Sequence, residues 1–442
     1  MRMSANRFAR DRSGNFGIIT ALVTVPLLTA VGMALDFGYA IDQRNDLLAA
    51  ADAAAVGALA SQSVGVLAAL QMEQDGVIKV GEEDARKFFQ GQTAKQVAAE
   101  GQGKNEDTEG VSLSGLDVSV TKKGADLKSE VKFTAKVPTT FLRLINQNYI
   151  TISGSATAVY NTGTYIDFYM LLDNTPSMGV GATDSDIATM ERNTSDSCAF
   201  ACHQLDKSNN YYALAKSLKV QMRIDVVRQA TQQLTYTAAD TMRYPGQYRM
   251  AVYTFGSSAE STKLTQVASM STDMAAVRKS ADAIDLMTIP YQNYNNDMAT
   301  DIDEAMTSLK TIIKKGGGGA SKSDPQKVVF FVSDGLTDSA KAGKCTKKTT
   351  NGTRCQEPID YSFCQPLKDA GIKVAVLYTT YLPLPKNGWY NNWIKPFQSE
   401  IAKNMESCAS PGFYFEVSPS EGISDAMTAL FQKIVSTPRI SS

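Results

Sequence analysis

The sequence predicts an α/β protein in which a doubly wound, mainly parallel sheet follows a long N-terminal transmembrane helix and a small β-rich linker module. Three observations predict this order: a long uncharged apolar stretch, then segments of polar–apolar alternation, then apolar strands that alternate with helical patterns. The 442 residues are 43% hydrophobic and 20% charged, which is typical of folded protein. The formal net charge of -1 gives no general attraction to nucleic acid.

The first element is a candidate membrane span. Ser13–Leu35 holds 23 positions without a charged residue, and a span needs about 20. The preceding tip carries one acid, Asp11, and four basic residues: Arg2, Arg7, Arg10 and Arg12. This excess of arginine predicts that the N-terminus stays in the cytoplasm and that the chain after Asp36 is exported. The alternative is a cleaved secretory signal, although the apolar stretch is long for one.

The alanine-rich segment Leu47–Ala60 has high helix propensity and continues the same helix. We therefore expect one helix from about Asn15 to about Ser61, and we assign residues 1–62 to a cytoplasmic tip, a transmembrane segment and a periplasmic helix. The small residues of its outer half either receive a partner helix or belong to a stalk without a partner.

The β-rich linker module is expected over residues 63–162. Val111–Val120, Ser129–Val137 and Tyr149–Val159 alternate polar and apolar residues and are rich in Val, Thr and Ile, which is typical of half-buried antiparallel strands. The polar tract Glu100–Gly110 is expected to be an exposed loop.

The doubly wound domain is expected over residues 163–442, where strand and helix patterns alternate. The candidate strands are Tyr165–Leu172, Tyr248–Phe255, Val328–Ser333, Lys373–Tyr378 and Phe413–Val417. The candidate helices are Ala213–Thr241, Thr272–Leu286, Thr300–Lys315, Tyr361–Ala370, Ile394–Glu406 and Ile423–Val435.

Oxygen-bearing side chains stand where these elements meet. Asp173, Thr175 and Ser177 follow the first strand, Asp334 follows the third, and Thr300 opens a helix. Since ligands of such sheets bind beyond the carboxyl ends of the strands, we expect these five residues to converge. Hydroxyl and carboxylate oxygens suit Mg²⁺ or another hard divalent cation such as Mn²⁺ or Ca²⁺. The alternative is that the two aspartates are polar residues that cap strand ends.

These segments resemble the metal-ion-dependent adhesion site of von Willebrand factor A domains, whose pattern is D-x-S-x-S, T and D on three loops. Thr175 replaces the commonest serine and keeps its hydroxyl. The resemblance implies that Ser177 and Thr300 ligate a metal ion together with Thr175 or Asp334, while Asp173 and Asp334 supply charge partly through water. It also implies a protein partner whose acidic side chain completes the shell of the metal.

The N-terminal region resembles the TadE/TadG-type anchor of tight-adherence (Flp) pilus systems through Phe8–Asn15, Asp36–Gly38 and Asn45–Ala58, and Val137–Leu142 resembles the linker of TadG proteins. Prepilin-like members carry Glu five residues after the processing glycine, where this chain has Ile19, so we expect the span to stay in place. The resemblance implies an adhesion or assembly protein of the pilus or its secretion machinery. It would be anchored in the inner membrane, with its bulk in the periplasm or reaching the cell surface.

All six cysteines lie in the predicted α/β domain, and their even number predicts disulfides in an exported chain. Cys198–Cys202 is one plausible pair, and a second is expected among Cys345, Cys355 and Cys364. Two alternatives for Cys198, Cys202 and His203 are a zinc site and, with one residue more than C-x-x-C-H, a haem attachment site.

We expect no enzymatic activity. His203 is the only histidine, which excludes Ser-His-Asp catalysis, and no glycine-rich phosphate loop occurs. Two competing interpretations are a surface or periplasmic A-domain binder without a pilus role and a metal-dependent hydrolase. The hydrolase would lack a positioned general base near Asp173.

Overall fold

The computed structural model describes residues 14–94, 97–98, 110–341, 345–349, 353–381, 383–418 and 422–436. The chain divides into two compact units, Met1–Thr162 and Gly163–Ser442. The N-terminal arginines and most of the tract Glu100–Gly110 lie outside the described residues, so the cytoplasmic tip and the exposed loop stay predictions.

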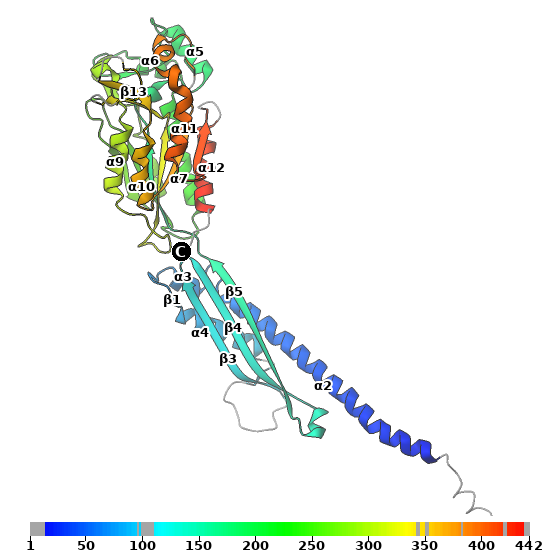
Figure 1. Cartoon of the computed structure of the whole chain (residues 1–442). Coiled ribbons are helices and arrows are strands. Elements are labelled where there is room, and N and C mark those ends of the chain that lie inside the picture. The colour runs from blue at the N-terminus through cyan, green and yellow to red at the C-terminus, as the bar shows by residue number, and fades with distance from the viewer. Residues whose placement is uncertain are drawn as a thin grey trace, which may run out of the picture. The chain divides into compact units, whose positions relative to one another are not determined.

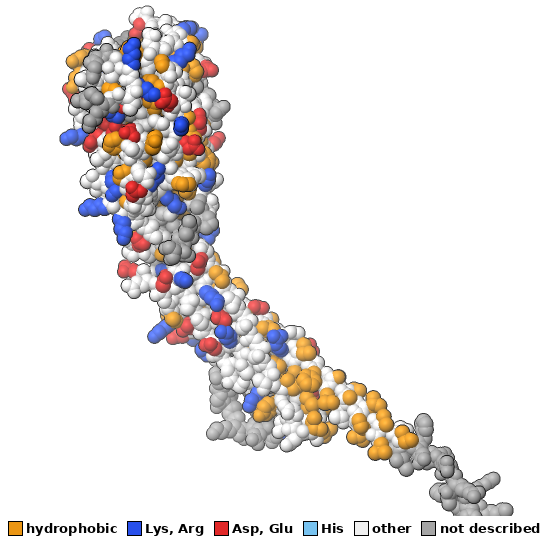
Figure 2. Space-filling model, viewed as in Figure 1, with side chains coloured by type: hydrophobic (Ala, Val, Ile, Leu, Met, Phe, Trp, Pro, Cys, Tyr) orange, Lys and Arg blue, Asp and Glu red, His pale blue; other side chains and the backbone are white. Residues whose placement is uncertain are grey.

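The predicted long apolar helix is confirmed in the first unit, where α2 runs from Gly14 to Ala58. Hydrophobic side chains gather on the surface of its first half, where Leu22 is 69% exposed (Figure 2). Further along, one face is buried at helical spacing, by Gly32, Asp36, Ala40, Leu47, Ala51, Ala54 and Ala58. In the described part of the chain, α2 alone has the length and composition to cross a membrane.

The three alternating segments form an antiparallel sheet in which β3 pairs with β4 and β4 with β5 (Figure 1). Every second residue of β4 from Leu127 to Val137 is buried, so the polar–apolar alternation in the sequence reflects one buried and one more exposed face of the strand. The ring of Phe89 in α4 stacks on that of Phe133, with 6.0 Å between the centroids. After α2, the elements of the unit are α3 Val64–Ala69, β1 Gly76–Val77, α4 Lys79–Thr93, β2 Val97–Ala98, β3 Val111–Lys123, β4 Asp126–Pro138, η1 Leu142–Ile145 and β5 Tyr149–Asn161.

The second unit is a mixed α/β domain on a six-stranded sheet of order β15-β14-β11-β6-β8-β9. The first five of these strands are parallel, and β9 joins β8 antiparallel at the edge. The sheet strands are β6 Ile166–Leu172, β8 Tyr248–Thr254, β9 Thr265–Ser271, β11 Gln326–Ser333, β14 Lys373–Thr379 and β15 Tyr414–Val417.

Helices of this unit pack on both faces of the sheet. Alternate residues of β6 enter separate cores: Phe168 and Met170 pack with α7, α8 and α12, whereas Leu171 packs with α9, α10 and α11. A strand buried on both faces reads as a continuous apolar run, which explains the uninterrupted sequence Val328–Val332. The helices are α5 Asp184–Asn193, α6 Tyr211–Ser217, α7 Arg223–Thr241, α8 Met274–Ala281, α9 Ile302–Ile312, α10 Gln365–Asp369, α11 Gln398–Cys408 and α12 Ile423–Ser436.

Shorter elements connect these helices and strands. They are η2 Pro176–Gly179, β7 His203–Gln204, β10 Thr288–Ile289, η3 Tyr294–Asp297, β12 Leu336–Ala340, β13 Arg354–Pro358, η4 Tyr361–Cys364, η5 Tyr390–Ile394 and η6 Lys395–Phe397. Two of them, β12 and β13, pair antiparallel as a separate two-stranded hairpin.

One helix prediction was wrong, and several elements were not predicted, among them α5, the edge strand β9 and the hairpin strands β12 and β13. The predicted helix Ala213–Thr241 is two helices, because α6 ends at Ser217 and Lys219 adopts a left-handed φ of 57° before α7 begins. No glycine or proline marks this break, so helix periodicity runs through it. The edge strand β9 was not predicted, since Ala268 is its single buried residue and the strand lacks a strong apolar pattern.

Candidate metal centre

The carboxyl ends of β6 and β11 lie side by side where the strand order reverses. From β6 the chain continues to β8 on one side, and it later returns to β11 on the other. Asp173 follows β6 and Asp334 follows β11, and the backbone N–H of Asp173 donates to the Val332 carbonyl at 2.9 Å. Such a reversal opens the crevice in which open α/β sheets bind ligands.

Asp173 is fully buried and organises the loop after β6. Its Oδ1 accepts the backbone N–H of Thr175 at 2.9 Å and the Thr175 hydroxyl at 2.7 Å, and its Oδ2 accepts the Ser333 hydroxyl at 2.6 Å. The hydroxyls of Thr175 and Ser177 are 3.4 Å apart. Burial and the nearby Asp334 carboxylate raise the pKa of Asp173 to about 7, although the bonds from Ser333 and Thr175 lower it.

Asp334 is also fully buried and faces a buried cation. Nη1 of Arg223, at the start of α7, lies 3.4 Å from Asp334 Oδ2. Burial raises the pKa of Asp334, while Arg223 and a hydrogen bond from the Ser177 hydroxyl act in the opposite direction. Arg223 Nη2 donates to the Thr380 carbonyl at 3.2 Å, and among the described residues its Nε has no hydrogen-bond partner. The ion pair is therefore long and incompletely bonded.

The residue after Asp334 explains the tight turn there. Gly335 has a left-handed φ of 69°, and a Cβ at this position would lie 2.7 Å from a side-chain atom of Met405. Glycine is the residue that adopts this conformation without strain and without a side chain to clash.

Thr300 reaches the same region through its backbone. Its N–H and C=O bond the C=O and N–H of Asp338 in β12, both at 2.9 Å, and the residue is 4% exposed. Side-chain hydrogen bonds thus connect Asp173, Thr175, Ser177 and Asp334, whereas Thr300 is placed by the strand that starts two residues after Asp334.

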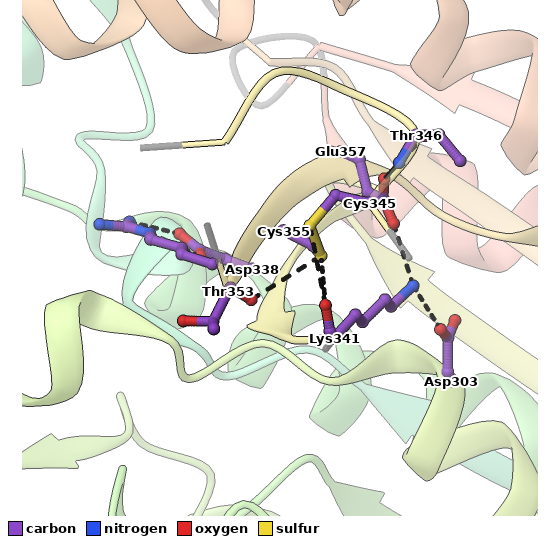
Figure 3. Close-up of a disulfide and its surroundings, with 9 residues drawn as sticks. Asp303, Asp338, Lys341, Cys345, Thr346, Thr353, Cys355 and Glu357 are labelled. Carbon is purple, nitrogen blue, oxygen red and sulfur yellow. Dashed lines mark hydrogen bonds and ion pairs between the residues drawn. A yellow bond between two sulfur atoms is a disulfide. The ribbon is translucent and has the colours of Figure 1, made fainter. Parts of the chain in front are cut away.

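The β12–β13 hairpin that holds Thr300 is braced by ion pairs. Arg354 donates to both carboxylate oxygens of Asp338, at 2.8 Å from Nε, and its guanidinium lies 4.3 Å from the Trp389 ring centre. Figure 3 shows Lys341 reaching both Asp303 of α9, at 2.6 Å, and Glu357 of β13, at 3.1 Å. The hairpin is thereby tied to the helix that Thr300 precedes.

Two disulfides support this face of the unit. Cys345–Cys355 staples the hairpin (Figure 3), which confirms a pair among the three cysteines expected to supply one, and Cys364–Cys408 joins η4 to α11. The predicted pair Cys198–Cys202 is wrong, since both are free thiols in the structure. Between them, Phe200 forms an isolated antiparallel bridge with Val180.

The donor set fits a hard divalent cation. Asp173 and Asp334 are two fully buried carboxylates with raised pKa values, and a single guanidinium lies 3.4 Å from Asp334, which leaves negative charge uncompensated when both are ionised. Hydroxyl oxygens of Thr175 and Ser177 stand beside them. Among the described residues no three His, Cys, Asp or Glu side chains gather as a metal site, so a cation here would depend on the hydroxyls.

Sequence reasoning missed Arg223 and Ser333. Arg223 was assigned to the middle of one continuous helix, and only the break before α7 turns it toward Asp334. Ser333 immediately precedes Asp334 and donates its hydroxyl to Asp173. A polar residue at the end of an apolar strand is the sequence feature that could have indicated this role.

Comparison with protein families places a match at the N-terminus: residues 14–62 match the family model described as putative Flp pilus-assembly TadE/G-like. Comparison with curated proteins gives no match. The N-terminal segment of the chain is therefore TadE/G-like.

Among solved structures, the chain is similar to the vWF domain of the type V pili tip protein Mfa5 from Porphyromonas gingivalis, at 10% identity and a TM-score of 0.37, covering 63% of this chain and 99% of that one. The PilB minor pilin from Streptococcus sanguinis gives 14% identity and a TM-score of 0.34, covering 75% and 81%. The pilus adhesin SpaC from Lactobacillus rhamnosus GG gives 11% and 0.36, covering 75% and 36%. Likeness at this level does not establish the function of this chain.

Proposed function

We propose that this chain is a membrane-anchored, metal-dependent adhesion or assembly protein of a tight-adherence (Flp) pilus or its secretion machinery. The observation that carries the proposal is the connected cluster of Asp173, Thr175, Ser177 and Asp334 at the switch point of the sheet. The TadE/G-like segment 14–62 supports the pilus role, and the apolar surface of α2 supports anchoring.

The parallel sheet with helices on both faces supports a doubly wound fold of the von Willebrand factor A type over residues 163–442. The role is recognition, not catalysis. The anchor is assigned to residues 1–62 and the linker module to 63–162, with the N-terminus in the cytoplasm of an inner-membrane protein and the bulk in the periplasm.

Each residue of the cluster has a defined part in this function. The hydroxyls of Ser177, Thr300 and Thr175 hold Mg²⁺ or a similar cation together with Asp334, and Asp173 orients Thr175 through two hydrogen bonds. A bound divalent cation supplies positive charge and open positions for oxygen ligands. A partner protein provides an acidic side chain to one of these positions.

The test is capture of partners from membranes of the source bacterium by the tagged wild-type chain, in Mg²⁺ and in chelator. We expect pilus or secretion proteins in Mg²⁺, and their loss in chelator and in the Ser177→Ala variant. Ser217→Ala, which removes an exposed hydroxyl in α6, is the matched control and should capture the wild-type set.

Two outcomes contradict the proposal. Capture of identical partners in all conditions would show that the metal does not take part in recognition. Capture of Mg²⁺-dependent partners unrelated to pili would indicate a metal-dependent binding protein without a pilus role. Turnover of a substrate that Asp173→Ala abolishes would instead favour a hydrolase.

A further inference from the structure

The turn between β4 and β5 is held against α2 inside its apolar stretch. Phe141 packs on Gly32 so closely that a Cβ on Gly32 would lie 2.5 Å from the Phe141 Cβ. Gly32 is three residues before the end of the uncharged stretch Ser13–Leu35, which is about 4.5 Å along a helix axis. Figure 1 shows this turn beyond the paired ends of β4 and β5, next to α2.

One turn further along α2, Asp36 fastens the same loop. Its carboxylate accepts three backbone N–H groups, from Thr140 at 2.9 Å, Phe141 at 2.9 Å and Leu142 at 2.7 Å. Asp36 is 7% exposed, and burial raises its pKa, yet these three bonds bring the pKa below its ordinary value. A carboxylate removed from water needs such donors, and here the loop provides them; within the described part of the chain no cation pairs with Asp36.

The turn exposes three bulky apolar side chains, next to the exposed polar residues Arg143 and 146–148. Leu144 and Ile145 are 79% and 58% exposed, and Phe141 is 37% exposed. At the same level α2 exposes Val31 and Leu35, so the turn extends the apolar surface of the helix. Bulky apolar groups gathered in this way on a surface mark a contact with a partner or a membrane.

The position along α2 selects the bilayer as that contact. A 23-residue helix measures about 35 Å, slightly more than a hydrocarbon core of about 30 Å, so the level of Gly32 falls at the edge of the core. The exposed aromatic residues Phe37 and Tyr39 follow on α2, and Tyr149 begins β5. Aromatic side chains are typical of this interfacial level.

We propose that the β4–β5 turn is a second membrane contact, in which Phe141, Leu144 and Ile145 enter the lipid on the exported side, beside the end of the transmembrane segment. The sheet of the first unit is then fixed to the membrane at two points, the helix and the turn. The occupant of the apolar surface is lipid, not a protein partner.

The test places an environment-sensitive fluorophore on Leu144→Cys in the 442-residue chain, with Cys198→Ser and Cys202→Ser removing the free thiols. The chain is reconstituted at one copy per lipid nanodisc, so that no protein partner is present. We expect blue-shifted emission, strong quenching by lipids that carry a nitroxide near the headgroup, and iodide quenching several-fold weaker than at a water-exposed position.

Two further positions calibrate the measurement. Val159→Cys lies near the opposite end of β5 and is 68% exposed, so it should show strong iodide quenching and little lipid quenching. Val25→Cys, 66% exposed within the apolar stretch, should be quenched by lipid. If the probe at Val25 is quenched by lipid but the probe at Leu144 responds as the probe at Val159 does, the second membrane contact is wrong, while the transmembrane role of α2 is still supported. Protection of Leu144 that appears only with two chains per disc would also overturn it.

A glycine pair tests the docking itself. Gly32→Ala should displace Phe141 and reduce the lipid quenching at Leu144, whereas a Cβ on Gly38 meets no atom within 4 Å and Gly38→Ala should leave the quenching unchanged. Equal quenching in both variants would show that the contact with Gly32 does not position the turn.

Discussion

At the scale of single residues, buried charge decides the chemistry of the candidate metal centre. Asp173 and Asp334 are both fully buried, and Arg223 is the cation that pairs with Asp334. When both carboxylates are ionised, one negative charge is not matched by this guanidinium. The site can remove that charge by binding a proton or a cation, and the pKa of about 7 at Asp173 means that protons compete near neutral pH.

The raised pKa of Asp173 predicts a pH dependence of stability. An aspartate in the unfolded chain titrates near 4, so the folded state binds the proton more tightly, and this contribution is present at low pH and lost as the pH rises from about 4 to about 7. In metal-free buffer we expect the free energy of unfolding to fall by about 1–3 kcal/mol between pH 5 and pH 8. Denaturant titration of the chain in nanodiscs measures this fall.

Two variants, each of which neutralises one carboxylate, test whether Asp173 causes this pH dependence. Asp173→Asn should flatten the pH dependence, and Asp240→Asn, an exposed position on α7, should retain it. Saturating Mg²⁺ should also flatten it, because the cation holds Asp173 ionised. A wild-type stability independent of pH in chelator would contradict the raised pKa.

Arg223 predicts a larger effect. Arg223→Met leaves Asp334 as a buried charge without a partner, so we expect a loss of about 3–5 kcal/mol in chelator. Mg²⁺ should restore part of the loss, since it neutralises the same carboxylate. Lys386→Met is the control: Lys386 pairs with Glu191 at 2.8 Å but is 69% exposed, and its loss should cost about 0–1 kcal/mol. Equal losses in the two variants would argue against the buried pair.

At the scale of elements, the β12–β13 hairpin determines where Thr300 lies. Thr300 was expected to join the other four residues by opening a helix; in the structure its backbone pairs with Asp338 of the hairpin, and Asp301, the N-cap of α9, follows it. The hairpin is a small two-stranded piece, and such pieces are marginal unless something staples them. The Cys345–Cys355 disulfide and the Lys341 ion pairs provide the staple.

The disulfide therefore predicts a local effect. Replacing Cys345 and Cys355 by Ser removes a staple that closes a 10-residue separation, worth about 2–3 kcal/mol. We expect faster hydrogen exchange at the amides of Thr300 and Asp338, which bond each other, while the sheet strand β11 keeps its protection. Replacing Cys364 and Cys408 should loosen η4 and α11 instead, and unchanged exchange at Thr300 in the first variant would contradict the role of the hairpin.

At the scale of the whole molecule, the chain forms two compact units with separate cores. The first buries the stacked rings of Phe89 in α4 and Phe133 in β4, and the second has a core on each face of its sheet. Substitutions in the anchor unit should therefore leave Mg²⁺ binding unchanged, and substitutions in the metal centre should leave membrane insertion unchanged.

The orientation of the chain in the membrane is the prediction at this scale. The proposed topology exports the second unit, so a Ser217→Cys variant without the free thiols should react with a membrane-impermeant maleimide in intact spheroplasts. A cysteine placed at Met1 should react only after lysis. Reaction of the Met1 position in intact spheroplasts would reverse the assigned topology.

The sequence by itself determined the elements with strong local patterns. The uncharged stretch of α2, the alternation of β3, β4 and β5, and the apolar runs of β6, β11 and β14 are each visible over successive residues, because burial imposes a period on the side chains. The order of these elements along the chain also predicted the mixed α/β class.

Only the tertiary structure decided which residues from distant parts of the chain contact each other. Three examples are the pairing of Arg223 with Asp334, the free thiols of Cys198 and Cys202, and the packing of the Phe141 side chain on Gly32. None of these leaves a period in the sequence. They depend on how far apart packed elements lie, a quantity fixed by the whole core and not by neighbouring residues.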